Sequence, residues 1–258
     1  MSASNWSLTL AYDGTDFAGW QRQPDQRTVQ ADLESALARL AGARVVTHAA
    51  GRTDAGVHAR AQVVSFVMPR PWDAAELHAA LLALTPPDMH VRAVRPAPTG
   101  FHARKHATAR RYAYYVGCDA DARSPFRRRY EWAVGRPLDP AGLAAAAAPL
   151  PGEHDFRAFS AAGQVKSHYR CNIAHAEWRE RPEGAGFIFE VEADRFLHRM
   201  VRFLVGMAVD VALGRRPAAD VGRLLQATEN TDASPPAPPE GLYLMAVRYP
   251  KPDEGATG

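Results

Sequence analysis

Apolar and polar residues follow two spacings along this chain, and these spacings predict strands and helices in a repeating order. In the first 105 residues, apolar positions alternate with polar ones in some segments and recur every three to four residues in others. The predicted strands cover 6–13, 44–49, 61–67 and 89–95, and the predicted helices begin after Thr28 and after Asp73. The resulting order, β-α-β-β-α-β, is that of a ferredoxin-like unit with a mostly antiparallel sheet.

The remainder of the chain predicts the same plan with one inserted strand. The predicted strands cover 108–117, 130–134, 169–178, 187–193 and 242–249, and the predicted helices begin at Asp139, Asp194 and Pro217. Four prolines make 233–241 a surface loop. We therefore expect an α+β fold with ferredoxin-like halves at 1–105 and 106–250, the second carrying a basic insert, and a disordered tail at 251–258. The two sheets could join or face each other across a cleft.

Charge is distributed unevenly over the 258 residues. The whole chain is only +3, and its 47% hydrophobic residues exclude disorder as a description of the whole. Between Arg92 and Arg136, however, eleven basic residues stand against three acidic ones, so this region carries 11 − 3 = +8 and the rest carries 3 − 8 = −5. We call 92–136 the basic region, and its charge predicts a polyanionic partner.

Several site classes find no support in the residues. Cys118 and Cys171 are too few for a disulfide framework and form no zinc motif, and the loop from Asp13 lacks the acidic twelfth residue of a calcium loop, having Pro24 there. We therefore expect no metal. The N-terminus lacks the pattern of a secretory leader, and no apolar run is long enough for a membrane span, so we expect a cytoplasmic protein.

One segment between two predicted strands gathers reactive side chains. Residues 50–59 read AGRTDAGVHA, which places Arg52, Asp54 and His58 together with two glycines. Asp54 could act as nucleophile or base, with Arg52 as its charge partner. The loop could equally be an ordinary Asx-type turn in which Thr53 or Asp54 bonds the local backbone.

Two other segments combine cations with apolar or aromatic residues. Residues 101–112 interleave His, Arg and Lys with Tyr112, which suits phosphate contacts and base stacking, although a solvated sheet edge has the same composition. His102 and His106 lack further ligands for a metal. Further on, Arg199 and Arg202 share a helix face, so one could reach a carboxylate while the other contacts phosphate, and a pair that is merely solvated fits the pattern equally well.

With these segments in order, the sequence resembles the A-type tRNA pseudouridine synthase family over nearly its whole length. The resemblance rests on five motifs: Tyr12-Asp13-Gly14 with Gly19-Trp20-Gln21-Arg22-Gln23; 51–59; Phe101-His102-Ala103-Arg104 with Arg111-Tyr112; Met200-Val201-Arg202 with Gly206; and Glu240-Gly241-Leu242-Tyr243-Leu244. One departure is Ala61, where the family commonly has Gly, and it affects only local backbone geometry.

The resemblance implies a function and a set of roles. It implies the pseudouridine synthase fold, in which two ferredoxin-like halves flank a central cleft, and an isomerase that converts uridine to pseudouridine at positions 38, 39 and 40 of the tRNA anticodon stem-loop. It also implies a homodimer that needs no cofactor. The implied catalytic residues are Asp54 as nucleophile, with Arg52 and Arg202 organising charge, and the implied substrate-binding residues are Tyr112, Arg104, Arg111 and Leu244.

Two other function classes compete with this reading. A non-catalytic RNA-binding module of ferredoxin-like fold would bind RNA without forming product and would not need Asp54. A retaining glycosidase would need a second carboxylate close to the first, which the motifs do not supply.

Overall fold

Residues 4–96 fold into four strands and two helices in the predicted order. The computed structural model describes residues 4–161, 168–181, 185–227 and 232–250, so the predicted tail at 251–258 lies outside the described residues. The elements are β1 (Ser4–Tyr12), α1 (Val29–Ala41), β2 (His48–Ala49), β3 (His58–Met68), α2 (Ala74–Leu84) and β4 (Met89–Pro96). The hydroxyl of Thr28 caps α1 and the Asp73 carboxylate caps α2, as their sequence positions predict.

The second part of the chain adds six strands and three helices within the described ranges. They are β5 (Ala109–Gly117), β6 (Trp132–Ala133), α3 (Pro140–Ala147), β7 (Gly152–Asp155), β8 (Arg170–Glu180), β9 (Gly186–Ala193), α4 (Met200–Ala212), α5 (Ala219–Leu224) and β10 (Leu242–Arg248). Three single 3-10 turns accompany them: η1 (Ala120–Arg123), η2 (Arg157–Phe159) and η3 (Pro239–Gly241).

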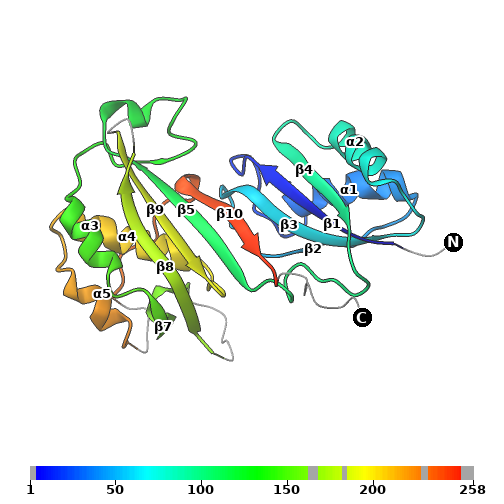
Figure 1. The fold of residues 1–258 in the computed structure, drawn as a ribbon. Helices are drawn as coiled ribbons and strands as arrows, with labels where there is room; N and C mark the ends of the chain where they lie inside the picture. The colour runs from blue at the N-terminus through cyan, green and yellow to red at the C-terminus, as the bar shows by residue number, and fades with distance from the viewer. Residues whose placement is uncertain (1–3, 162–167, 182–184, 228–231, 251–258) are drawn as a thin grey trace.

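All ten strands belong to one sheet, so the two parts are joined edge to edge (Figure 1). Its order is β4-β1-β3-β10-β5-β9-β8-β7, with β2 paired to β3 and β6 to β5. Most pairs are antiparallel, and β10 joins the parts by running parallel to β3 through Tyr243 and Leu244. The mixed α and β composition and the mostly antiparallel sheet are thereby confirmed. Of the two arrangements left open by the sequence, the sheets join.

Several elements differ from the sequence prediction in extent, and one strand was not predicted. The strand predicted over 44–49 is paired only at 48–49, and β7 (GEHD) was not predicted because it has no apolar alternation. The helix expected from Asp194 begins at Met200, because Arg199 adopts the left-handed conformation with φ of 61°. Residues 194–199 therefore form a loop that leads into α4.

A single apolar cluster runs through both parts of the molecule. Trp6, Leu8 and Leu10 alternate on β1 and are buried, and α4 buries side chains around most of its circumference, including Met200 and Val205. The joined sheet and the shared core fix the loops at the β3–β10 junction relative to each other. Among the described helices, none combines the length and apolarity needed to cross a bilayer.

Candidate active site

The segment 50–57, which we call the Asp54 loop, connects β2 to β3 and is held by buried polar groups. The backbone N–H of Trp20 donates to the Thr53 carbonyl at 3.0 Å, and the Thr53 hydroxyl bonds the Tyr12 hydroxyl at 2.8 Å. The amide of Gln62, fully buried on β3, donates to the Gly51 carbonyl at 2.7 Å. Burial raises the pKa of Tyr12 to about 12, so its hydroxyl keeps its proton near neutral pH.

Two glycines let the backbone of residues 14–20 approach the Asp54 loop. A Cβ at Gly14 would lie 2.1 Å from the Val57 carbonyl oxygen, and one at Gly19 would lie 2.7 Å from that of Thr53. Gly19 also has a φ of 93°, which disfavours a side chain there. These contacts give a physical reason for both glycines in the N-terminal motif.

The Asp54 carboxylate faces three basic side chains, two from the loop before α4 and one from its first turn. Arg202 Nη1 donates to Asp54 Oδ2 at 3.1 Å, His198 Nε2 lies 3.4 Å from Oδ1, and Arg199 Nε lies 4.0 Å from Oδ2. The side chains of Arg202 and Asp54 are only 11% and 23% exposed, so solvent screens this pair weakly. The Asp54 side chain therefore bonds across the sheet junction, which excludes the local Asx-type turn.

Arg52 does not form the predicted ion pair with Asp54. Its side chain is exposed, and it forms no ion pair within the described ranges. The reason is local geometry, since the loop turns Asp54 toward α4 while Arg52 stays at the surface. Arg202, distant in sequence, takes the position beside the carboxylate.

A reciprocal contact with the proline-rich loop fixes Arg202. Its Nε donates to the Ala237 carbonyl at 2.6 Å, and the Ala237 N–H donates back to the Arg202 carbonyl at 2.9 Å. The loop reaches α4 because Gly206 has no side chain, and a Cβ there would lie 2.1 Å from the Pro235 carbonyl oxygen. The predicted surface loop thus packs on α4 and orients the guanidinium.

Tyr112 and Leu244 lie side by side on adjacent strands next to this group. They are direct cross-strand partners on β5 and β10, so their side chains share a face of the sheet. Tyr112 is 8% exposed, and Phe196 packs edge-on against its ring at 5.0 Å between centroids. A Cβ on Gly51 would lie 3.6 Å from the Tyr112 hydroxyl. Burial, chiefly, raises the pKa of Tyr112, and the nearby Tyr12 and Asp54 add to the shift.

The three arginines before Tyr112 have different surroundings. Arg111 is exposed, and as the neighbour of Tyr112 on a strand it points to the opposite face of the sheet, away from the Asp54 group. Arg104 is exposed in the loop after β4. Arg110, two residues before Tyr112, shares its face and donates to the carbonyls of Ala50 and Arg104, both at 2.9 Å. Burial lowers the pKa of this guanidinium.

The basic region is less uniformly available than its composition suggests. Arg127 pairs with Asp119 at 2.7 Å and with buried Glu131 at 2.8 Å, and Arg129 pairs with Asp16 at 3.1 Å. The exposed cations of the basic region that form no ion pair among the described residues are Arg92, Arg95, Arg104, Lys105, Arg111, Arg123, Arg128 and Arg136. Of the eleven basic residues in this region, eight are therefore exposed without an acidic partner among the described residues, whereas Arg110, Arg127 and Arg129 are engaged within the protein.

His58, at the start of β3, connects three segments beneath the Asp54 loop. Its Nδ1 accepts the Gly14 N–H at 3.0 Å, and its Nε2 lies 3.1 Å from the Arg129 carbonyl and 3.2 Å from that of Glu240. Because Nδ1 itself accepts a hydrogen bond and Nε2 faces two carbonyl oxygens, the ring is neutral and carries its proton on Nε2. The imidazole, 1% exposed, stacks on Tyr243 at 4.6 Å.

Protonation of His58 should destabilise the fold. Burial lowers the pKa of His58 below 6.5, although Asp13, 3.2 Å from Nδ1, offsets part of this. Below about pH 6.5 the unfolded chain binds a proton that the folded chain excludes, so stability is full above this pH and declines as the pH falls toward the folded pKa. We expect the thermal midpoint to fall by about 3 °C more between pH 7.5 and 5.5 in the wild type than in His58→Asn. Exposed His90→Asn should retain the wild-type pH dependence, and an equal loss in both variants would contradict this role.

No metal centre is assembled in the described part of the chain, where no three His, Cys, Asp or Glu side chains are grouped suitably. His102 Nδ1 instead accepts the Arg104 N–H at 3.2 Å, and its ring stacks on His48 at 4.5 Å.

Sequence reasoning missed several groups that hold the site. Gln62, Tyr12, Arg110 and His198 were not selected, although each lies at or beside the Asp54 loop. Arg110 could have been found, because strand periodicity puts it on the face of Tyr112. The others depend on contacts between segments distant in sequence.

Comparisons with known proteins agree on one family. The family described as tRNA pseudouridine synthase matches residues 9–104 and 146–250. A tRNA pseudouridine synthase A of Myxococcus xanthus is 44% identical over 242 residues, covering 94% of this chain and 91% of the relative. Proteins of the same name are 41% identical in Moorella thermoacetica, over 94% of this chain and 98% of the relative, and 39% identical in Latilactobacillus sakei, over 95% and 98%.

The family match spans both strands that meet at the sheet junction and both segments that carry Asp54 and Arg202. The motifs that suggested the resemblance also form one structural unit, because Gly14, Gly19 and Arg202 all contact the Asp54 loop. The chain therefore belongs to the tRNA pseudouridine synthase family.

Proposed function

We propose that this protein converts uridine to pseudouridine in tRNA, at positions 38, 39 and 40 of the anticodon stem-loop. The observation that carries the proposal is the Asp54 carboxylate, held 3.1 Å from Arg202 across the sheet junction in a chain of this family. The reaction breaks the bond from N1 to C1′, turns the uracil, joins C5 to C1′ and releases the C5 proton. No atom or electron is supplied, so the chemistry requires no cofactor.

Asp54 supplies the anionic oxygen that the reaction requires. It attacks C1′ or removes a sugar proton, and in either role its carboxylate must be held in one geometry. Arg202 provides this by bonding Oδ2, and Ala237 in turn orients Arg202. We assign Asp54 the catalytic role and Arg202 the role of positioning it.

Tyr112 and Leu244 form the wall against which the detached uracil is held. Their shared face and the proximity of the Tyr112 hydroxyl to Gly51 support this assignment. A uridine in a stem must be flipped out before it reacts, and contact with an aromatic side chain compensates for lost stacking by about 1 to 3 kcal/mol. Phe196, which covers the Tyr112 ring, would have to move for full stacking.

In this proposal, the exposed arginines contact phosphates of the RNA backbone. Arg52 is exposed in the Asp54 loop and forms no ion pair with any described residue, and Arg104 is exposed in the loop after β4. Arg111 faces the opposite side of the sheet from Tyr112. We therefore propose phosphate contacts for all three, with Arg111 outside the uracil pocket.

The strand order in the two parts of the sheet supports a division of the chain into two halves. The order β4-β1-β3 with β2 on β3 has the same connectivity as β10-β5-β9-β8, and both correspond to the order of a ferredoxin-like unit. We propose two such halves, 1–105 and 106–250, with the reacting uridine bound in a cleft over their junction.

Nucleoside analysis of tRNA before and after incubation with pure protein tests the function. We expect new pseudouridine at positions 38 to 40 in substrate tRNA with uridine there, and none in tRNA whose uridines at these positions are replaced by cytidine. Binding without product would instead identify a non-catalytic RNA-binding protein.

Affinity for tRNA should fall steeply with salt. The exposed cations of the basic region release counterions when they contact phosphate, so log Kd should rise linearly with log salt between about 50 and 200 mM. Arg104→Gln should reduce the slope by about one, whereas Arg170→Gln, whose guanidinium already pairs with Glu153, should leave it unchanged. A flat salt response of the wild type would defeat the assignment.

We also propose, from the family resemblance, that the protein is a homodimer in which each tRNA contacts both subunits. Light scattering should give twice the 28.1 kDa chain mass. A monomer fully active on intact tRNA would contradict the shared-subunit arrangement. The expected cytoplasmic location stays a prediction.

A further inference from the structure

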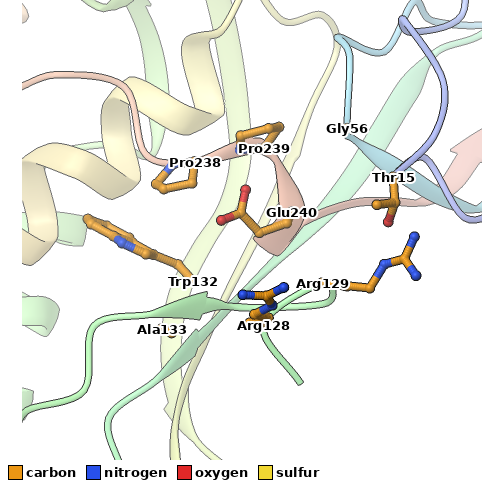
Figure 2. A pocket seen from close by; sticks show the side chains of 9 residues that line it. All are labelled: Thr15, Gly56, Arg128, Arg129, Trp132, Ala133, Pro238, Pro239 and Glu240. Atoms are coloured by element: carbon orange, nitrogen blue, oxygen red, sulfur yellow. The ribbon is translucent and has the colours of Figure 1, made fainter. Parts of the chain in front are cut away.

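A pocket of about 500 Å³ lies beside the Asp54 loop but does not include Asp54 (Figure 2). Four segments meet there: Gly56 from the Asp54 loop, Thr15 after β1, Arg128 to Ala133 from the inserted segment, and Pro238 to Glu240 at η3. Such a volume suits a small organic ligand. Apart from the general phosphate contact of Arg128 as an exposed cation of the basic region, none of the roles assigned above uses this pocket.

The charged groups at the pocket have complementary signs and are not paired with each other. Arg128 is exposed and Glu240 is half-buried, and neither forms an ion pair among the described residues. Arg129, the other cation of the wall, is already paired with Asp16 at 3.1 Å. Figure 2 shows the Glu240 carboxylate turned toward the space above Arg128, with the Trp132 ring on one side.

These groups limit the chemistry of a ligand. The Glu240 carboxylate disfavours a ligand that is only an anion, and Arg128 disfavours one that is only a cation. The ligand must therefore offer hydrogen-bond donors to Glu240 and a negative charge to Arg128. Trp132, half-buried, adds a flat apolar surface. A nucleotide with an exocyclic amino group on its base has all three features.

The pocket lies close to Asp54, the proposed catalytic residue. Gly56 follows Asp54 by two residues, so their Cα atoms are at most about 7.6 Å apart. A Cβ on Gly56 would lie 2.9 Å from the Pro239 ring, which joins the pocket wall directly to the Asp54 loop. A strand of RNA that delivers a uridine to Asp54 would carry its neighbouring nucleotides past this opening.

We propose that this pocket binds one unpaired adenosine, cytidine or guanosine nucleotide of the tRNA, close in sequence to the reacting uridine. The base lies along Trp132 and donates its amino group to Glu240, while its phosphate contacts Arg128. The inference rests on the proposed function, because it assumes that tRNA is the substrate. It identifies a second point of contact that would position the RNA without taking part in the chemistry.

Steady-state kinetics on substrate tRNA tests the proposal. Glu240→Gln keeps size but loses charge, and Arg128→Gln removes the phosphate partner. We expect each to raise KM about tenfold while the single-turnover rate at saturating tRNA stays within about twofold of the wild type. The matched controls are Glu153→Gln and Arg215→Gln, both at exposed ion pairs, and both should behave as wild type. Unchanged KM in both pocket variants would overturn the proposal.

Equilibrium dialysis with free nucleotides gives a readout that does not need catalysis. AMP, CMP and GMP should bind the wild type more tightly than UMP or inorganic phosphate, and Glu240→Gln should remove this preference. Equal binding of all five by the wild type would overturn base recognition. Selective nucleotide binding with an unchanged KM for tRNA would assign the pocket to a free nucleotide instead, which also contradicts the proposal.

The two proposals fail in different ways. A wild type that forms no pseudouridine but binds nucleotides with this selectivity would refute the proposed function and leave the pocket chemistry intact. A wild type that forms pseudouridine and whose KM ignores Glu240 and Arg128 would refute the pocket alone.

Discussion

Asp54→Asn should reduce pseudouridine formation by at least about a thousandfold while tRNA affinity changes little. Asn has nearly the size of Asp but no anionic oxygen to attack C1′ or accept a sugar proton. The Asp54 loop should still fold, because Thr53, Gly51 and the backbone near Trp20 hold it independently of the Asp54 carboxylate, and the Asn amide oxygen can still accept the hydrogen bond from Arg202. Folding and chemistry are thereby separated in one variant.

Release of tritium from uridine labelled at C5 measures this effect directly. Isomerisation frees that hydrogen without changing the mass of the tRNA, whereas methylation at C5 would increase the mass. Asp54→Glu keeps the charge but moves it by about one methylene, and a displacement on the order of 1 Å can cost about a hundredfold in rate. Wild-type tritium release by Asp54→Asn would disprove the catalytic assignment.

Replacing Arg202 should have the second largest effect. Arg202→Lys keeps a positive charge but cannot bond both Asp54 and the Ala237 carbonyl with a fixed planar group, so the carboxylate loses its orientation. We expect kcat to fall about a hundredfold with KM nearly unchanged, because Arg202 acts on Asp54 rather than on the substrate.

Arg199→Lys is the matched control for this experiment. Arg199 lies three residues earlier and also faces Asp54, but at 4.0 Å and with 45% of its side chain exposed, where solvent weakens the pair. We expect a change in kcat of less than about threefold. Equal losses in the two variants would show that net charge near Asp54, rather than the geometry of Arg202, governs the rate.

Regular elements with a strong period were predictable from local sequence. Thr28 and Asp73 cap helices, and the alternation on β1 defines a buried face, because capping and burial patterns act over a few residues. The start of α4 was not predictable. The left-handed Arg199 interrupts an otherwise helical pattern, and nothing in the local periodicity indicates this.

The sequence alone determined the order of the elements other than β7, the Asp54 loop as the candidate site and the family that the motifs indicate. Only the tertiary structure decided which groups act together: Arg202 rather than Arg52 lies beside Asp54, and His58 is a buried connection between three segments. The physical reason is the sequence distance over which each kind of interaction acts. Propensity and periodicity are local, whereas Asp54 and Arg202 are 148 residues apart and come together in a fold whose two sheet parts are joined by β10.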